Sequence, residues 1–266
     1  MTDHERVTRA FVDTADGQIH YRTAGHGQPL LLLHQTPRSS DEYRDVVPIL
    51  AREFRVIAMD TIGYGDSYKP EKACSIEDYA KGAVDLLDGL GVRRTAVVGH
   101  HTGAVIGIEL AASYSSRVER LVLSASPYVD GAERERRKSR PPIDEVEVRE
   151  DGGHLTELWR RRMSFYPKGR PDLLTRFVID ALRAGDKVEE GHRSCSAYRM
   201  EEKLGRIRCP TLLVCGTEDP FSSPWMQTLA AHIEGSRAAA LPGGTVAMVD
   251  QMPLEFARAI YDFLRD

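Results

Sequence analysis

The sequence has few cysteines, no long apolar run and no excess of positive charge. Its 266 residues include only four cysteines, none in a C-x-x-C pair, so reduced thiols are expected in place of a disulfide framework. No stretch approaches the roughly 18 apolar residues that a membrane span needs, and the formal net charge is −4. Residues 1–6 have no apolar signal core. We therefore expect a cytoplasmic protein that binds neither a membrane nor nucleic acid, and whose partner is a small molecule.

Short apolar runs alternate with amphipathic stretches along most of the chain. A continuous apolar run is typical of a strand buried on both faces, and alternation of such strands with helices predicts an α/β fold with a parallel sheet. The sheet is expected to be mostly parallel and eight-stranded, beginning with an antiparallel hairpin. The expected strands are near 11–12, 19–21, 30–33, 55–59, 95–98, 118–124, 211–215 and 238–241, and the expected flanking helices are 41–50, 76–90, 102–114, one from about 224, and 253–264.

The stretch 127–206 interrupts this alternation. Charged residues at 133–138, two prolines at 141–142 and two glycines at 152–153 break the pattern, and no strand is expected. Helices are expected near 155–165, 172–184 and 189–204. We therefore predict a core formed by residues 1–126 and 207–266, with a helical cap at residues 127–206.

A glycine-flanked turn follows the strand predicted at 95–98. The segment Gly99-His100-His101-Thr102-Gly103 leads directly into an apolar helix. A strand, a sharp turn and a helix in this order form the nucleophile elbow, in which the central residue is exposed at the end of the sheet. That central position holds His101, where a serine, cysteine or aspartate is usual. The strand, turn and helix of the elbow are therefore easier to predict than the reaction that His101 supports.

Five motifs in this order give the chain a resemblance to the α/β-hydrolase superfamily, in its capped small-molecule branch. The resemblance covers nearly the whole length. The motifs are His34-Gln35 after a strand, Asp60-Thr61-Ile62-Gly63-Tyr64-Gly65-Asp66-Ser67, the elbow at 99–103, Gly216-Thr217-Glu218-Asp219, and Pro242-Gly243-Gly244-Thr245-Val246 with Pro253 downstream.

The resemblance implies a role for each matching position. The backbone N–H groups of Gln35 and Thr102 would form an oxyanion hole, and Asp219 would be the acid that orients an imidazole. The position of the catalytic histidine, however, holds Val246. Because the nucleophile position holds His101 and the usual base is missing, ordinary Ser-His-Asp chemistry is not expected.

We hypothesise that the two substitutions compensate each other. An imidazole is longer than a hydroxymethyl group and Val246 is smaller than histidine, so His101 is able to lean toward Asp219 and form a dyad. Such a pair suits cofactor-free acid–base or hydrolytic chemistry on a small carbonyl-containing molecule. Direct attack by the imidazole to give an acyl-imidazole is a second route.

Other residues are candidates for the substrate pocket. They are His34, Val246, His192, Phe221 and Trp225, and His192 is preferred among the histidines and aromatics of the cap. His34 and His100 also suit purely structural roles. A metal site from His34, His100 and His101 is not expected, since adjacent side chains on a strand point to opposite sides. No cofactor is expected.

Two alternatives to the dyad enzyme stay open. One is a ligand-binding protein without catalysis, because an apolar residue replaces the catalytic histidine. The other is an ester, lactone or C–C bond hydrolase whose base comes from the cap, with His192 as the example. The sequence also allows a homodimer and does not decide the substrate or the reaction.

Overall fold

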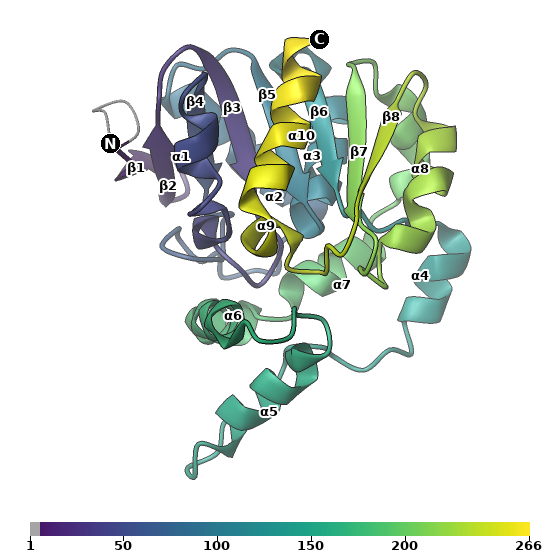
Figure 1. Cartoon of the computed structure of the whole chain (residues 1–266). Helices are drawn as coiled ribbons and strands as arrows, with labels where there is room; N and C mark the ends of the chain where they lie inside the picture. Colours follow the sequence, from purple (N-terminus) through teal and green to yellow (C-terminus); the bar gives the residue numbers. More distant parts are fainter. Residues whose placement is uncertain (1–5) are drawn as a thin grey trace.

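Eight strands form one twisted sheet in the structure, a computed structural model that describes residues 6–266 (Figure 1). The expectation for the N-terminal segment falls almost entirely on residues 1–5, which lie outside the described residues. The strand order is β1-β2-β4-β3-β5-β6-β7-β8; β2 is antiparallel to its neighbours, and the pairs from β4 to β8 are parallel. The α/β prediction and the strand count are confirmed. The strands are β1 Thr8–Asp13, β2 Gln18–Ala24, β3 Gln28–Leu33, β4 Phe54–Met59, β5 Thr95–His100, β6 Val118–Ser124, β7 Thr211–Gly216 and β8 Arg237–Leu241.

Helices cover both faces of the sheet, which explains the continuous apolar strands. In β3, Leu31 and Leu33 pack into the core cluster that contains α2 (Ile76–Gly89) and α3 (Thr102–Ser113). Leu30 and Leu32 point the other way, into the cluster with α1 (Val47–Leu50) and α10 (Pro253–Arg265). Successive side chains of a strand alternate between faces, so both must be apolar here. The short helices α8 (Met226–His232) and α9 (Met248–Gln251) complete the layers.

Several helices begin or end at residues other than those expected. The helix predicted at 41–50 is split into a 3₁₀ turn at Ser40–Tyr43 and the single turn α1. Pro48 near the start of α1 has no N–H to donate backward, so a continuous helix through this point would lose a hydrogen bond. At the start of α2 the reciprocal capping box of Ser75 and Asp78 forms as predicted.

Between β6 and β7 the described chain contains helices only. They are α4 Gly131–Arg137, α5 Gly153–Met163, α6 Pro171–Ala184 and α7 Glu190–Ala197, and we call residues 127–206 the cap segment. The charged stretch expected to interrupt the chain forms α4, because the Asp130 side chain accepts the Glu133 N–H at its start. The helix expected at 189–204 ends at Ala197 and continues as two 3₁₀ turns.

The cap segment has its own small core, which joins it to the sheet. Leu158, Tyr166, Leu173 and Phe177 cluster with Ala247, a residue of the loop after β8. In Figure 1, α5 and α6 lie beyond the end of the sheet where α9 and α7 are found. In the described part of the chain, no helix is both long and apolar enough to cross a membrane.

Candidate active site

The elbow between β5 and α3 holds His101 in a strained backbone conformation. Its φ of 46° and ψ of −110° lie in a region that non-glycine residues rarely adopt. The flanking glycines allow the close approach: a Cβ at Gly99 would lie 2.1 Å from the Gly103 carbonyl oxygen, and one at Gly103 would lie 2.0 Å from that of Leu33. The sequence therefore packs α3 directly against the strand ends, with the His101 ring at the tip.

His101 and Asp219 lie side by side. The His101 Nε2 is 2.8 Å from Asp219 Oδ2, with the carboxylate fully buried and 14% of the His101 side chain exposed. Within the described residues neither of these two buried atoms has another hydrogen-bond partner, so each faces only the other. Asp219 Oδ1 accepts the N–H groups of Phe221 and Ser222 at 2.9 and 3.2 Å. Burial alone would raise the pKa of Asp219, but the His101 ring and the Phe221 N–H outweigh it and hold that pKa below its usual range.

The carboxylate also determines how the His101 ring is used. A carboxylate accepts and cannot donate, so Nε2 carries the ring proton in the neutral form. This leaves Nδ1 with the lone pair, directed away from Asp219. Nδ1 is thus the atom of His101 that is able to take a proton or attack a carbon.

The second histidine of the elbow, His100, is structural. Burial, and then the neighbouring His101, lower the pKa of His100 to about 3, so it is neutral at physiological pH. Its Nε2 donates to the Val246 carbonyl at 3.1 Å, and its Nδ1 accepts from the Ser124 hydroxyl at 2.8 Å. Val246 itself is buried, 2% exposed. His100 therefore anchors the loop that carries the valine.

The Gln35 N–H, predicted as an oxyanion donor, already has an acceptor in the structure. The Gln35 backbone N–H donates to Glu42 Oε2 at 2.9 Å, and its side-chain amide donates to Glu42 Oε1 at 2.6 Å. The next residue, Thr36, fits better, since no hydrogen bond to its N–H is found within residues 6–266. The Thr36 Oγ1 lies 2.8 Å from Thr102 Oγ1, which brings the two backbones together beside His101. The Thr102 N–H is in the first turn of α3, where it has no intrahelical acceptor.

Glu42 is a fully buried acid under the Gln35–Thr36 turn. Burial, opposed only in part by Arg38 and the Gln35 donors, raises the pKa of Glu42 to about 8. The balance of charges around Glu42 also supports a protonated Glu42. The buried or half-buried groups around it include three guanidinium groups, of Arg22, Arg38 and Arg176, and three further acids, Asp41, Asp180 and Asp250. With Glu42 protonated, the positive and negative charges cancel.

This raised pKa predicts a pH-dependent stability. The unfolded pKa of glutamate is near 4.5, so the folded protein holds a proton that the unfolded chain has lost between about pH 4.5 and pH 8, and stability falls as the pH rises through this window. Glu42→Gln cannot ionise. We expect its unfolding midpoint to fall less between pH 5 and pH 8 than that of the wild type, measured by thermal unfolding. Glu53→Gln, at an exposed acid, is the control, and parallel curves for Glu42→Gln and the wild type would contradict the protonated state.

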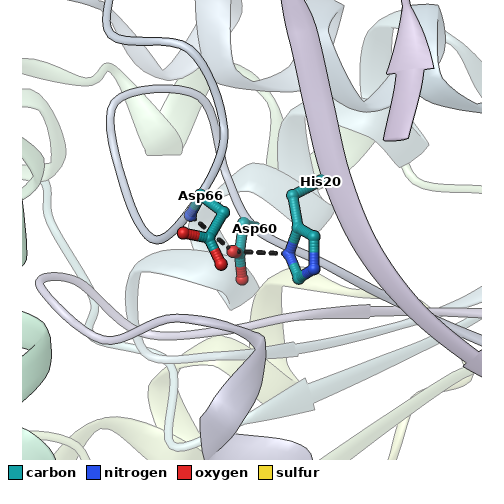
Figure 2. Close-up of side chains that lie close together, drawn as sticks. All are labelled: His20, Asp60 and Asp66. Carbon is teal, nitrogen blue, oxygen red and sulfur yellow. Dashed lines mark hydrogen bonds and ion pairs between the residues drawn. The ribbon is translucent and has the colours of Figure 1, made fainter. Parts of the chain in front are cut away.

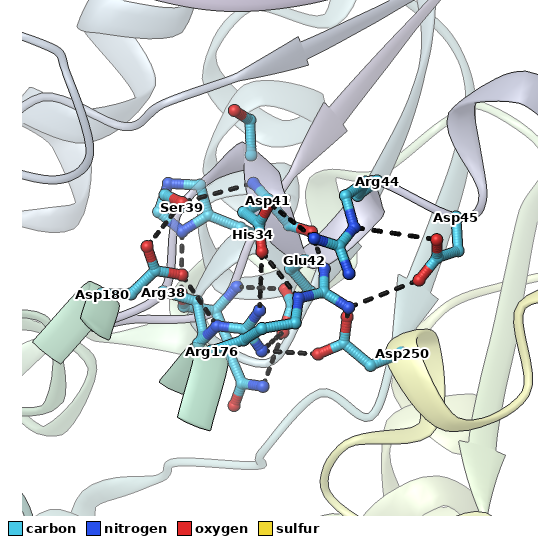
Figure 3. Close-up of polar contacts among 12 residues, drawn as sticks. His34, Arg38, Ser39, Asp41, Glu42, Arg44, Asp45, Arg176, Asp180 and Asp250 are labelled. Carbon is cyan, nitrogen blue, oxygen red and sulfur yellow. Dashed lines mark hydrogen bonds and ion pairs between the residues drawn. The ribbon is translucent and has the colours of Figure 1, made fainter. Parts of the chain in front are cut away.

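A buried charge network beside this turn ties the cap segment to the core (Figure 3). Arg38 has no exposed surface; its Nε donates to Asp180 of α6 at 2.9 Å and its Nη1 to Asp250 of α9 at 2.5 Å. The Ser39 hydroxyl donates to the other Asp180 oxygen at 2.9 Å. Arg176 of α6 contacts Asp250 Oδ1 at 2.9 Å. The segment after β3, helix α6 of the cap segment and helix α9 therefore meet at Arg38.

The remaining pocket candidates are only partly brought to the site. Phe221 follows the acid loop and its ring contacts Phe165 of the cap segment, with centroids 4.8 Å apart. Trp225 instead packs on Tyr128 at the main core. His34 does not face a pocket: it is fully buried, its Nδ1 donates to the Gln35 carbonyl and its Nε2 accepts the Thr61 N–H. Those two predicted contacts with ligand are therefore not supported.

Two groups of acidic and histidine side chains have the spacing of metal ligands within the described residues. In the first, His20 Nδ1 lies 2.8 Å from Asp60 Oδ2, which also accepts the Asp66 N–H at 2.8 Å (Figure 2). The other Asp60 oxygen accepts the Ser40 N–H at 2.6 Å. Since both oxygens hold backbone donors, we assign Asp60 to bracing the loops. The second group, around Asp144, is occupied by an arginine and is treated below.

The sequence matches the family model described as alpha/beta hydrolase fold over residues 28–194. The chain belongs to the α/β-hydrolase fold family. Solved structures agree on the architecture: the enol-lactonase from Burkholderia xenovorans LB400 superimposes with a TM-score of 0.81 at 19% identity, covering 97% of this chain and 100% of that one. At this identity the likeness shows the fold alone.

Hydrolases are found among the related α/β-hydrolase sequences. The chain is 41% identical over 123 residues to a soluble epoxide hydrolase of Corynebacterium sp., covering 46% of this chain and 41% of that protein. It is 28% identical to a fluoroacetate dehalogenase of Burkholderia sp, covering 98% of this chain and 95% of that one. The first of these relatives is matched over less than half of its length. The comparisons thus support a hydrolase-fold enzyme in the broad sense.

Sequence reasoning missed several residues of the site. Thr36 was overlooked because the resemblance placed the donor one position earlier. Glu42 lies within the helix predicted at 41–50 and Arg38 in the segment that leads into it, and the burial of both follows from tertiary packing that no local pattern reveals. A polar run directly after a buried strand, His34-Gln35-Thr36 with Arg38 close behind, was the available signal.

Proposed function

We propose that this α/β-hydrolase-fold protein is a cofactor-free enzyme that hydrolyses a small carbonyl-containing molecule, an ester or lactone, with His101 as base. The observation that carries the proposal is the 2.8 Å contact between His101 Nε2 and the buried Asp219 carboxylate. An acid kept in place next to an imidazole is the orienting half of hydrolase catalysis. The free Nδ1 is the reacting half.

The proposed reaction uses water as the nucleophile. His101 Nδ1 takes a proton from water while the water oxygen attacks the carbonyl carbon. The carbonyl oxygen becomes an oxyanion, and the N–H groups of Thr36 and Thr102 stabilise it. Collapse of this intermediate breaks the bond to the leaving oxygen, which takes a proton from the imidazolium and restores neutral His101. The products are a carboxylic acid and an alcohol, or one hydroxy acid from a lactone.

Attack by the imidazole itself is the competing route within the same proposal. It would form an acyl group on His101, and water would then release it. Only this second route passes through a covalent acyl group on His101.

The test is a panel of 4-nitrophenyl esters and small aliphatic lactones, followed by intact-mass measurement of rapidly quenched enzyme. We expect turnover of at least one probe, no added acyl mass, and loss of turnover in His101→Gln. An added acyl mass that disappears in His101→Gln would replace the water route with the acyl-imidazole route. No turnover of any probe would reject the proposal.

A ligand-binding protein without catalysis is the second candidate. Its supporting observation is Val246, a buried apolar residue at the position of the catalytic histidine, fixed there by His100. A probe ester or lactone that binds by calorimetry and is recovered unchanged, with the same affinity in Asp219→Asn, would favour this candidate.

A further inference from the structure

A second histidine–carboxylate pair lies in the cap segment. The His192 Nε2 lies 2.9 Å from Asp144 Oδ2, within hydrogen-bond geometry, and 3.2 Å from the Nη2 of Arg162, which donates to the same oxygen. Asp144 is fully buried, whereas 25% of the His192 side chain is exposed. When Nε2 carries the proton and donates it to the carboxylate, Nδ1 of His192 is left free. The arrangement repeats that of His101 and Asp219.

Asp144 is firmly anchored, and the anchor excludes a metal ion. Arg162 of α5 donates to both Asp144 oxygens, one at 2.6 Å and the other in a shorter contact. The Asp144 N–H donates to Glu189 at 2.9 Å, and Arg162 lies over the Phe177 ring at 4.8 Å. Burial alone would raise the pKa of Asp144, but Arg162 and then His192 lower it to about 2. A cation at this acid would have to displace a buried guanidinium, so we assign the carboxylate to orienting His192.

The residue before His192 packs against the turn beside His101. His192 follows Gly191, whose backbone packs so closely on Thr36 that an added Cβ would lie 2.1 Å from Thr36 Oγ1. Thr36 Oγ1 is in turn 2.8 Å from Thr102 Oγ1, and Thr102 follows His101 in the chain. The start of α7 is therefore in contact with Thr36, one of the two proposed oxyanion donors. The side chains of His101 and His192 are both partly exposed.

We propose that Asp144 and His192 form a second acid–base pair, which the cap supplies to the His101 site. This inference rests on the proposed hydrolysis and divides its proton transfers between two rings. His101 Nδ1 takes the proton of the attacking water, while a protonated His192 gives its Nδ1 proton to the leaving oxygen as the carbon–oxygen bond breaks. His101 ends protonated and His192 neutral, and exchange with solvent restores both.

Two rings with free Nδ1 atoms explain how the site works without a histidine at position 246. The usual catalytic histidine both takes and returns the proton. Here Val246 is unable to do either, and the second ring lets the acid and the base be different residues.

The test compares His192→Gln with His154→Gln, a cap histidine whose Nδ1 only accepts the Arg149 N–H. The glutamine amide at 192 is able to keep the hydrogen bond to Asp144, so folding is preserved. On the best probe ester we expect kcat of His192→Gln to fall about a hundredfold, as for loss of a general acid, with KM within threefold. A kcat within twofold of the wild type overturns the proposal.

A second readout does not depend on turnover. Ring ¹⁵N signals of His192 are recorded at pH 7 in the wild type and in His101→Gln. If the two rings share one site, removal of the His101 ring changes the surroundings of His192, so we expect these signals to shift. If the wild type turns over no probe, the proposed hydrolysis has failed, and this spectrum alone decides: unchanged His192 signals overturn the shared site.

Discussion

Asp219→Asn is expected to lower kcat by about a thousandfold or more while leaving the fold intact. The Asp219 Oδ1 accepts two backbone N–H groups, from Phe221 and Ser222. The asparagine carbonyl oxygen will stay at that position, because its NH₂ group would face two donors there. The NH₂ group therefore turns toward His101 Nε2. The ring must then accept at Nε2 and carry its proton on Nδ1, and the lone pair that serves as base is lost to the substrate.

Steady-state kinetics on the best probe ester measure the loss of kcat in Asp219→Asn. Ring ¹⁵N NMR shows which nitrogen of His101 carries the proton. We expect Nε2 protonated in the neutral wild type and Nδ1 protonated in Asp219→Asn. Near-ultraviolet circular dichroism checks that the variant is folded. A variant that keeps kcat within fivefold of the wild type, with the tautomer exchanged, would show that Nδ1 of His101 is not the reacting atom.

Arg38→Met is expected to lower the free energy of unfolding by about 3–5 kcal/mol, the usual cost of removing one partner from a buried ion pair. Methionine fills a similar volume but leaves Asp180 and Asp250 without their guanidinium. Both carboxylates are almost fully buried, so water does not replace the lost donor cheaply. Urea unfolding at pH 7 measures the loss.

Arg44→Met is the matched control. Its side chain is 52% exposed and its contacts with Asp41 and Asp45 are long, at 4.0 and 3.8 Å, so a loss below about 1 kcal/mol is expected. The double variant Arg38→Met with Asp180→Asn should lose less than the sum of its single variants, because the two groups interact. Equal losses for Arg38→Met and Arg44→Met would contradict a network that holds the cap on the core.

The sheet was predictable because its signals are local and repeated. Continuous apolar runs such as Leu30–Leu33 are compatible only with strands covered on both faces, and both faces are covered. The capping box of Ser75 and Asp78 is equally local. Where tertiary context decides, prediction failed: the 41–50 segment was expected to be one helix, and Glu42 within it became a buried acid under a turn.

The candidate site also has one part that the sequence predicts and other parts that it does not. The neighbourhood of His101 and Asp219 follows from topology, since β5 and β7 end at the same edge of the sheet with one strand between them. The proposed oxyanion donor does not follow from topology, because Gln35 and Thr36 are neighbours in the chain. Only the hydrogen bond from the Gln35 N–H to Glu42 shows that Thr36 is the better candidate. The Asp144–Arg162–His192 cluster joins three separate parts of the cap segment, so no spacing in the sequence predicts it.

The most direct test of the account is kcat/KM of His101→Gln on the probe that the wild type turns over best. Glutamine keeps a polar side chain of similar reach at the strained elbow but supplies no base. The account predicts a loss of at least a thousandfold, while His154→Gln stays within twofold of the wild type. A His101→Gln enzyme that keeps more than a tenth of the wild-type kcat/KM would show that the chemistry is carried by another group.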